Sequence, residues 1–322
     1  MVWQMNIVAD GKLLLPSRGY RFRQEFMMLV NTPSVAVIGF GEAGSSLCIG
    51  WNRRDVRSFD IKQTDPDLNA AKLAEIQDHG VDATEDIRTA VTGADMIFST
   101  VTADQAFAAA SSAAPWLKPG AFFFDLNSCA PSTKQKSAAV IEAVGGRYVD
   151  IAVMATITSY YHQTPMLICG DHSSAALAAL QALDMAPKLV SGPVGRASTI
   201  KMVRSVLVKG IEALTAECFW AASTAGVLDE VAASLDASQT DMGWKEQAHY
   251  NAERMTTHGI RRAAEMREVH KTLTDLGISP DMTRGTIDRQ DQWGRLGISL
   301  VDLDSFESRI AAIETAIGAQ KS

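Results

Sequence analysis

The feature that most restricts the fold of this chain is a glycine motif near its beginning. Residues 35–44 read VAVIGFGEAG, so four strand-forming residues lead into Gly39, Gly41 and Gly44 at the spacing GxGxxG. At a strand–turn–helix junction the first glycine permits the tight turn, the second lets the backbone approach a pyrophosphate, and the third allows close helix–strand packing. The free N–H groups of the helix then point at the phosphates. The motif therefore predicts a dinucleotide-binding domain.

A second strand pattern at 56–60 ends in Asp60, which lies 21 residues after Gly39. At about this distance an acidic residue of a dinucleotide-binding fold accepts hydrogen bonds from the adenosine ribose. A carboxylate there repels the 2′-phosphate of NADP, so Asp60 favours NAD as the cofactor. Lys62, Arg53 and Arg54 are close enough in sequence to weaken this preference, and NADP remains an alternative.

Short apolar runs alternate with helical stretches from residue 34 to about residue 190. Strands are expected at 35–39, 56–60, 95–101, 121–125, 147–152 and 165–169, and a helix at 70–79. Strands that alternate with helices indicate a mainly parallel sheet with helices on both faces, the doubly wound Rossmann-type α/β fold. Ligands of such a sheet bind at the carboxyl ends of its strands.

The character of the sequence changes after Gly195. Helices are expected at 197–225, 229–235, 247–256, 260–276 and 303–317, and strand signals are nearly absent. The glycine- and proline-containing turn at 191–195 is the natural boundary. We therefore expect an N-terminal extension of uncertain role at 1–31, a dinucleotide-binding domain at 32–192 and an all-helical domain for substrate binding and dimerisation at 193–322.

Composition and charge exclude several classes of protein. The 322 residues are 47% hydrophobic and 21% charged, with a net charge of −7, which is typical of a soluble two-domain protein and argues against nucleic acid as a partner. No apolar run reaches the roughly 18 residues of a membrane span. The cysteines, at 48, 129, 169 and 218, form no CxxC pair. We therefore expect reduced thiols in a cytoplasmic protein, without a disulfide framework or a metal site.

Candidate catalytic residues lie at strand ends and near the domain boundary. Asn127 and Ser128 follow the strand at 121–125 and can bind a substrate hydroxyl or carboxylate, although a helix cap explains the same residues. Lys201 lies early in the helix at 197–225, among small and apolar neighbours. A lysine in such surroundings can act as a general base or acid, and a solvent-exposed helix lysine is the alternative. Ser205 follows one helical turn later.

The order of these segments resembles the β-hydroxyacid dehydrogenase superfamily, which includes 6-phosphogluconate, 3-hydroxyisobutyrate and tartronate semialdehyde dehydrogenases or reductases. The resemblance covers about residues 34–217. It rests on the glycine motif, the Asp-x-Asn-Ser-x-x-Pro segment at 125–131, Asp150 followed by Val153, the segment 165–170 and the helix lysine Lys201. Residues 254–266 are similar to a poorly characterised branch related to 6-phosphogluconate dehydrogenase.

The resemblance implies an NAD(P)-dependent oxidoreductase that acts on the CH–OH group of a small, anionic β-hydroxy acid. Lys201 matches the family's catalytic lysine, which takes the hydroxyl proton. Asn127 stands where many members have a substrate-binding serine, and Ser128 beside it is expected to take over that role. Ser205 replaces the usual asparagine, so substrate contacts there must differ. Nothing in the sequence indicates whether decarboxylation follows oxidation.

Arg261 and Arg262 are expected to supply positive charge to the anionic substrate, and a solvated basic helix face is an equally good interpretation. The expected cofactor site comprises Gly39, Phe40, Gly41, Glu42, Ala43, Gly44, Asp60, Thr100, Val101 and Thr102. Because family members usually dimerise through the helical domain, we expect a homodimer.

Two other functions are compatible with the sequence. A non-catalytic protein that senses the dinucleotide is the first, because Asn127 and Ser205 depart from the family pattern. An imine reductase is the second, because related folds reduce C=N bonds. Such enzymes often have a different residue at the lysine site, so Lys201 favours hydroxyl chemistry.

Overall fold

The computed structural model describes residues 33–238 and 241–319. The chain divides between Val203 and Arg204 into two compact units, each of which is described by itself. None of the helices in the part of the chain that the structure describes combines the length and the apolar character of a membrane span.

The first unit is built on one eight-stranded sheet in the order β3-β2-β1-β4-β5-β6-β7-β8. All neighbouring strands are parallel except β6 and β7, which confirms the predicted mainly parallel α/β fold. The strands are β1 (Val35–Ile38), β2 (Val56–Phe59), β3 (Asp82–Ala83), β4 (Met96–Ser99), β5 (Phe122–Asp125), β6 (Arg147–Val153), β7 (Met166–Cys169) and β8 (Pro187–Leu189). The order reverses at β1 and β4, where parallel sheets bind ligands at their carboxyl ends.

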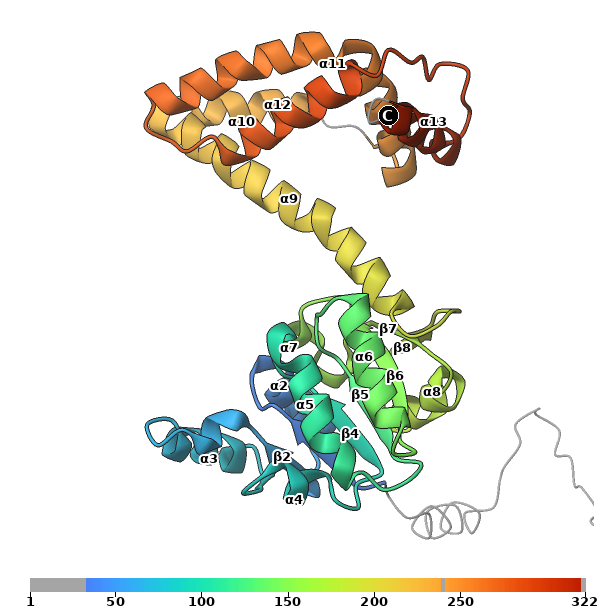
Figure 1. Ribbon diagram of the computed structural model, residues 1–322. Coiled ribbons are helices and arrows are strands. Elements are labelled where there is room, and N and C mark those ends of the chain that lie inside the picture. The colour runs from blue at the N-terminus through green and yellow to red at the C-terminus, as the bar shows by residue number, and fades with distance from the viewer. Residues whose placement is uncertain (1–32, 239–240, 320–322) are drawn as a thin grey trace, which may run out of the picture. The chain divides into compact units, whose positions relative to one another are not determined.

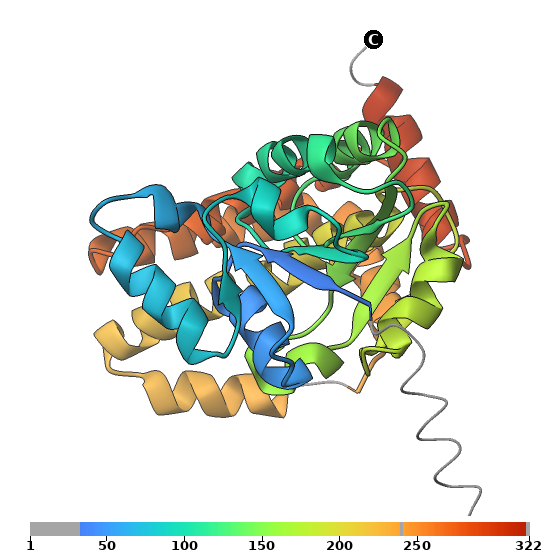
Figure 2. The ribbon, with the colours of Figure 1, turned by 90° about the horizontal axis from the view of Figure 1, so that it is seen from below.

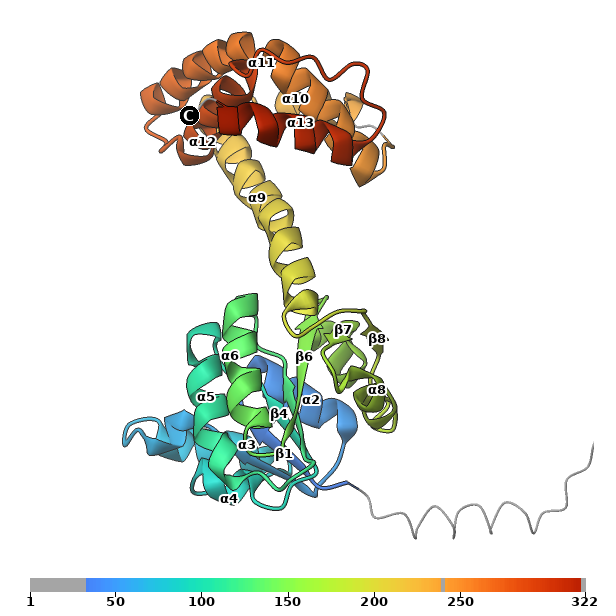
Figure 3. The ribbon, with the colours of Figure 1, turned by 45° about the vertical axis from the view of Figure 1, so that its right-hand side comes forward.

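Helices cover both faces of this sheet, as Figures 1 and 3 show for the first unit and Figure 2 shows from below. Alternation along β1 sets the two layers, because successive side chains point to opposite faces. Val35 and Val37 pack in one core with α2 (Glu42–Trp51), α3 (Asn69–Asp78), α7 (Ile157–Tyr160) and α8 (Ser173–Gln181). Ala36 and Ile38 pack in the other with α4 (Ile87–Val91), α5 (Ala106–Ala113) and α6 (Pro131–Glu142).

The described residues of the second unit are helical, as predicted. Helix α9 (Arg196–Ala225) crosses from the first unit into the second, and α10 (Leu228–Ala237), α11 (Trp244–Asp275), α12 (Asp281–Gly294) and α13 (Phe306–Ala319) follow. The buried side chains of Ala252, Leu296, Leu300 and Ile313 form its core.

Two predictions for the second unit were wrong. The expected helices at 247–256 and 260–276 are one helix, α11. Gly259, which lies between the two expected ranges, does not interrupt it; a Cβ atom there would be 2.2 Å from the carbonyl oxygen of Gln290 on α12, so this glycine permits a close helix crossing. Helix α12 was not expected, since its sequence DMTRGTIDRQDQWG is mostly polar.

In the first unit, the edge strands β3 and β8 were also missed, because runs of two and three residues have too few side chains to show a pattern.

Candidate functional site

The glycine motif forms a loop between β1 and α2 at the carboxyl edge of the sheet. Gly39 has a φ of +88°, and a Cβ atom there would be 2.8 Å from the carbonyl oxygen of Thr100. A Cβ atom on Gly44 would be 2.3 Å from the carbonyl oxygen of Gly39. At Gly41 a Cβ atom would meet nothing within 4 Å. The packing therefore requires the first and third glycines, whereas the second leaves open space at the N-terminus of α2, as pyrophosphate binding demands.

Charged side chains hold this loop in place. Asp60, buried at the end of β2, accepts hydrogen bonds from the backbone N–H of Phe40 at 2.6 Å and of Lys62 at 2.9 Å. The buried Lys72 on α3 donates to the carbonyl oxygen of Phe40 at 2.9 Å. A carboxylate offers about four acceptor positions on its two oxygens, so Asp60 can shape the loop and still accept a ribose hydroxyl.

A cavity of about 420 Å³ opens beside the loop, at the ends of β1, β2 and β4. Six predicted cofactor residues line it: Gly39, Gly41, Asp60, Thr100, Val101 and Thr102. Phe40, Glu42, Ala43 and Gly44 belong to the same loop and helix start but do not line the cavity, and the ring of Phe40 is fully buried in the core. Lys62 and Asp86 lie at the cavity as well. The open cradle at Gly41 and the acceptor Asp60 fit a dinucleotide.

Two of the predicted catalytic residues are in contact. The ammonium of Lys201, on the second turn of α9, donates to the hydroxyl of Ser128 at 2.6 Å. Ser128 is exposed on the segment after β5, and Lys201 is half-buried. A cation and a hydroxyl at this distance can bind one substrate oxygen together and transfer its proton.

Asn127 and Ser205 are placed differently from this pair. Asn127 is buried, and its amide donates to the hydroxyl of Ser99 at 2.9 Å, so one of its two N–H groups is committed within the protein. Its side-chain oxygen has no hydrogen-bond partner among the described residues. Ser205 is half-buried one turn after Lys201 on α9 and belongs to the second unit, whereas the other three residues belong to the first.

A buried lysine that the sequence analysis missed lies behind the Ser128–Lys201 pair. Lys134 on α6 is fully buried and donates to the carbonyl oxygen of Asp125 at 2.6 Å and to its carboxylate at 2.9 Å. A carboxylate oxygen of Asp150 lies 3.5 Å from the same ammonium. Burial alone lowers the pKa of Lys134, but the two carboxylates outweigh burial and hold this pKa above its ordinary value.

The two aspartates connect this lysine to both catalytic segments. The carboxylate of Asp125 accepts a hydrogen bond from the backbone N–H of Asn127 at 2.9 Å. The carboxylate of Asp150 caps the start of α9, where it accepts from the N–H of Gly195 at 3.0 Å and from the hydroxyl of Ser198 at 2.6 Å. The Asp125–Lys134–Asp150 network therefore fixes the Ser128 segment relative to the first turns of α9, which carry Lys201.

Helical spacing was the signal that identifies Lys134 as buried. Residues 134, 137, 138 and 141 recur at i, i+3, i+4 and i+7 along α6 and are all buried. The lysine thus lies on the buried face of its helix.

The three buried cysteines are not activated as nucleophiles. Burial raises the pKa of Cys48 to about 12 and that of Cys169 to about 11, and it also raises the pKa of Cys129 beside Ser128. Because the thiolate is the reactive form, these three side chains are inert thiols at neutral pH.

Two family models match the chain. The NAD binding domain of 6-phosphogluconate dehydrogenase matches residues 34–191, which include the glycine loop, the cavity and the Asp125–Lys134–Asp150 network. A domain of unknown function, DUF1932, matches residues 222–293 in the second unit.

Solved structures are similar to most of the chain. A conserved hypothetical protein from Sinorhizobium meliloti 1021 is 30% identical, with 89% of this chain and 97% of that chain covered and a TM-score of 0.55. The conserved protein MTH1747, described as structurally similar to 3-hydroxyacid dehydrogenases, is 24% identical, with coverages of 87% and 98% and a TM-score of 0.50. A reductive aminase from Aspergillus terreus, in complex with NADPH4, cyclohexanone and allyl amine, is 18% identical, with coverages of 87% and 99% and a TM-score of 0.65.

Proposed function

We propose, from the premise that this chain belongs to the β-hydroxyacid dehydrogenase superfamily, that it oxidises a small anionic β-hydroxy acid or reduces the corresponding carbonyl compound. The contact of 2.6 Å between Lys201 and Ser128 carries this proposal, because it joins a proton-transferring group to a hydroxyl in the unit that holds the dinucleotide cavity.

The residues of the first unit have distinct tasks in this reaction. Bound NAD(P) supplies the hydride acceptor or donor. The N–H groups at the start of α2, with Gly41 between them and the cavity, would hold its pyrophosphate, and Asp60 its adenosine ribose. In its neutral amine form Lys201 takes the proton of the substrate hydroxyl during oxidation and becomes the ammonium, and during reduction the ammonium returns a proton to the carbonyl oxygen. Ser128, which already accepts a hydrogen bond from Lys201, orients the same substrate oxygen.

Asp60 favours NAD over NADP in this proposal, because the negatively charged 2′-phosphate of NADP would face the carboxylate of Asp60. Lys62 lies at the same cavity and supplies a cation within reach of a 2′-phosphate. The balance between NAD and NADP therefore depends on two opposite charges that are two residues apart in sequence.

Reduction of an imine is the second candidate function. The likeness of the fold to the reductive aminase, at a TM-score of 0.65, favours it. The two reactions share the hydride step and differ in the atom that receives the proton, which is nitrogen in an imine and oxygen in a carbonyl. The contact between Lys201 and the hydroxyl of Ser128 favours the carbonyl reaction, in which oxygen receives the proton.

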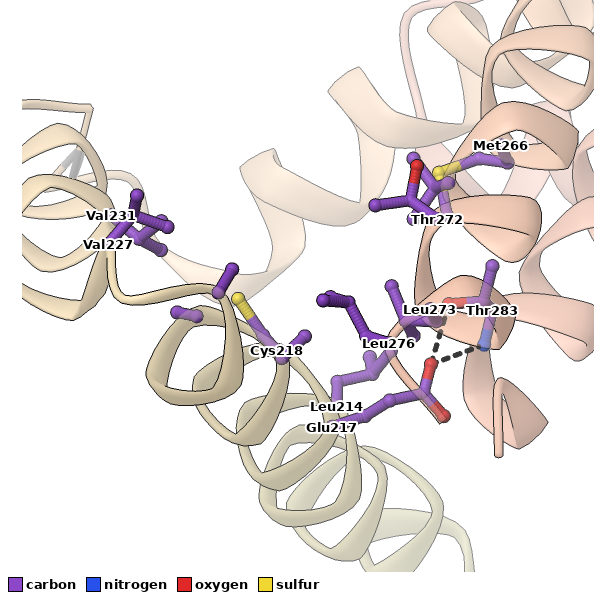
Figure 4. A pocket seen from close by; sticks show the side chains of 14 residues that line it. Leu214, Glu217, Cys218, Val227, Val231, Met266, Thr272, Leu273, Leu276 and Thr283 are labelled. Atoms are coloured by element: carbon purple, nitrogen blue, oxygen red, sulfur yellow. Dashed lines mark hydrogen bonds between the residues drawn. The ribbon is translucent and has the colours of Figure 1, made fainter. Parts of the chain in front are cut away.

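The second unit is proposed to bind a second copy of the chain. Apolar side chains are exposed along α9, among them Val206 at 76%, Leu207, Ile211 and Leu214. Leu214 also lines an apolar cavity of about 380 Å³, and Figure 4 shows it facing Leu273 and Leu276. A contiguous row of exposed apolar side chains is typical of an interface between proteins. Sedimentation of the full chain as a dimer, and as a monomer after Leu207→Asp, would support this assignment, and a monomeric wild-type protein would contradict it.

The function is tested by supplying the purified protein with hydroxy acids and either oxidised cofactor, and in parallel with imines and either reduced cofactor. Formation of reduced nicotinamide from a β-hydroxy acid is the expected result. Faster consumption of reduced cofactor with an imine would transfer the assignment to imine reduction. Tight cofactor binding without turnover of any compound would instead favour a dinucleotide sensor.

A further inference from the structure

A second polar cavity lies in the helical unit, at α11 and α12. Its volume is about 710 Å³, and Tyr250, Asn251, Arg254 and Arg262 of α11 line it together with Gln290 of α12. We call it the arginine cavity. All of these residues belong to the second unit, so the cavity is defined without reference to the first.

The charge of the arginine cavity is not balanced. Arg254 and Arg262 are both half-buried, and the described residues that line the cavity include no acidic side chain. The guanidinium of Arg254 donates to the hydroxyl of Tyr250 at 2.8 Å, which orients it without neutralising it. Within residues 33–238 and 241–319, no ion pair involves either arginine. Two cations are thus gathered at one hollow of a chain whose net charge is −7.

Gln290 gives a second, independent indication of a ligand. Its side chain is more than nine-tenths buried and lines the cavity, and its Oε1 atom has no hydrogen-bond partner among the described residues. Buried acceptors in proteins are nearly always paired, so an unpaired one requires an explanation. A ligand that brings an O–H or N–H group to this oxygen would satisfy it.

The spacing of the two arginines limits what this ligand can be. They are eight residues apart on α11, which corresponds to about 12 Å along the helix axis and about 80° around it, so their side chains must converge from successive turns to reach one ligand. Guanidinium groups bind carboxylates through paired hydrogen bonds, and two separated groups match a ligand with two carboxylates.

We propose that the arginine cavity binds a small dicarboxylate that carries a hydroxyl group. Each carboxylate pairs with one arginine, and the hydroxyl donates to Gln290. The inference goes beyond the proposed hydride transfer, since it does not involve Lys201 or the cofactor. It also separates the two arginines predicted as a pair from the sequence, because Arg262 lines the cavity whereas Arg261 is exposed outside it.

Calorimetric titration of the full chain with malate tests this proposal. We use the Lys201→Ala variant without cofactor, so that the proposed catalytic site does not contribute. Malate is expected to bind at one site per chain, about tenfold more tightly than lactate, which lacks the second carboxylate. It is also expected to bind more tightly than succinate, which lacks the hydroxyl. Absence of malate binding in this variant would overturn the proposal without bearing on the hydride chemistry.

Three variants locate the site. Arg254→Gln and Arg262→Gln are each expected to weaken malate binding about tenfold or more. Gln290→Leu is expected to remove the preference for malate over succinate. The matched control is Arg289→Gln, which replaces an exposed arginine next to Gln290 on α12 and should leave the affinity unchanged. Circular dichroism checks that each variant is folded. Equal affinities of Arg262→Gln, Arg254→Gln and Arg289→Gln for malate would contradict the proposal.

Discussion

The ammonium group of Lys134 lies 2.9 Å from a carboxylate oxygen of Asp125, and neither side chain has any exposed surface. Breaking a buried ion pair from one side leaves an uncompensated charge in a medium that solvates it poorly, which costs about 3–5 kcal/mol. The pair is thus an integral part of the first unit and determines how the segments around Lys201 are held.

Replacing Lys134 by methionine keeps the length of the side chain and removes its charge. We expect the free energy of unfolding to fall by about 3–5 kcal/mol in chemical denaturation. Turnover is expected to fall as well, because the Ser128 segment and the start of α9 lose their common partner. Lys136→Met is the matched control, since Lys136 is exposed on the same helix. Equal stability of the two variants would refute the role of the network.

Replacing Lys201 by alanine separates chemistry from cofactor binding. Loss of a general acid or base typically lowers turnover about 10²–10⁴-fold. Because Lys201 does not line the dinucleotide cavity, the affinity for NADH or NADPH should stay the same in a fluorescence titration. Lys209→Ala, on the exposed part of the same helix, should retain turnover. Survival of turnover within about tenfold in Lys201→Ala would show that another group transfers the proton.

The preference for NAD is expected to weaken in Asp60→Asn. The amide keeps nearly the shape of the carboxylate and no longer repels a 2′-phosphate, although its single oxygen can accept from only one of the N–H groups of Phe40 and Lys62. The ratio of the dissociation constants for NADPH and NADH should fall about tenfold. Lys62→Glu should move the ratio in the opposite direction. Tighter binding of NADPH than of NADH by the wild-type protein would show that Lys62 outweighs Asp60.

Glu217 makes the stability of the second unit depend on pH. Its carboxylate accepts hydrogen bonds from the N–H of Met282 at 2.8 Å, from the N–H of Thr283 at 3.0 Å and from the hydroxyl of Thr283 at 2.6 Å, at the start of α12 (Figure 4). Burial raises the pKa of Glu217, but these hydrogen bonds outweigh burial and lower it. A lowered pKa means that the stabilisation is complete above the unfolded-state pKa of about 4.3 and is lost as the pH falls through the folded-state pKa.

Glu217→Gln should therefore lower the free energy of unfolding by about 1 kcal/mol at neutral pH. The difference from the wild-type protein should shrink as the pH falls below about 4. Glu230→Gln, on the exposed surface of α10, is the control. A difference that is independent of pH would mean that the charge of Glu217 is not what stabilises α12.

Two glycines of the second unit should respond in opposite ways to alanine. In Gly259→Ala the new Cβ atom would be 2.2 Å from the carbonyl oxygen of Gln290, so α11 and α12 must move apart, at a cost of about 1–3 kcal/mol. At Gly285, on α12, a Cβ atom meets nothing within 4 Å, and alanine should stabilise the helix by about 0.5–1 kcal/mol. Thermal unfolding measures both. A Gly259→Ala protein as stable as Gly285→Ala would contradict the close crossing.

The sequence was most informative where one local pattern determines one local structure. All six expected strands are present, because most of them are short, mainly apolar runs next to turn residues, and the glycine spacing predicted the loop after β1. Lys201 was singled out by its small and apolar neighbours, and its contact with Ser128 joins two of the residues that the sequence proposed.

The features that were missed depend on residues far apart in sequence. Helical spacing places Lys134 on the buried face of α6, but its partners Asp125 and Asp150 come from two neighbouring strands, and the pairing depends on the fold. Helix α12 is polar, and it depends on packing against α11 at Gly259 and on the carboxylate of Glu217. The unpaired oxygen of Gln290 is visible only when the cavity around it is known. Each of these features depends on tertiary contacts, which local sequence patterns do not predict.

The open space at Gly41 is required for ligand binding and not for folding. The backbone there has a φ of −89°, which every amino acid adopts, and a side chain would touch no other part of the protein. Valine at this position would leave the apoprotein intact and occupy the volume reserved for phosphate oxygens. The fold thus does not require the middle glycine, whereas the ligand does. A larger residue there would give a well-folded protein that no longer binds dinucleotides.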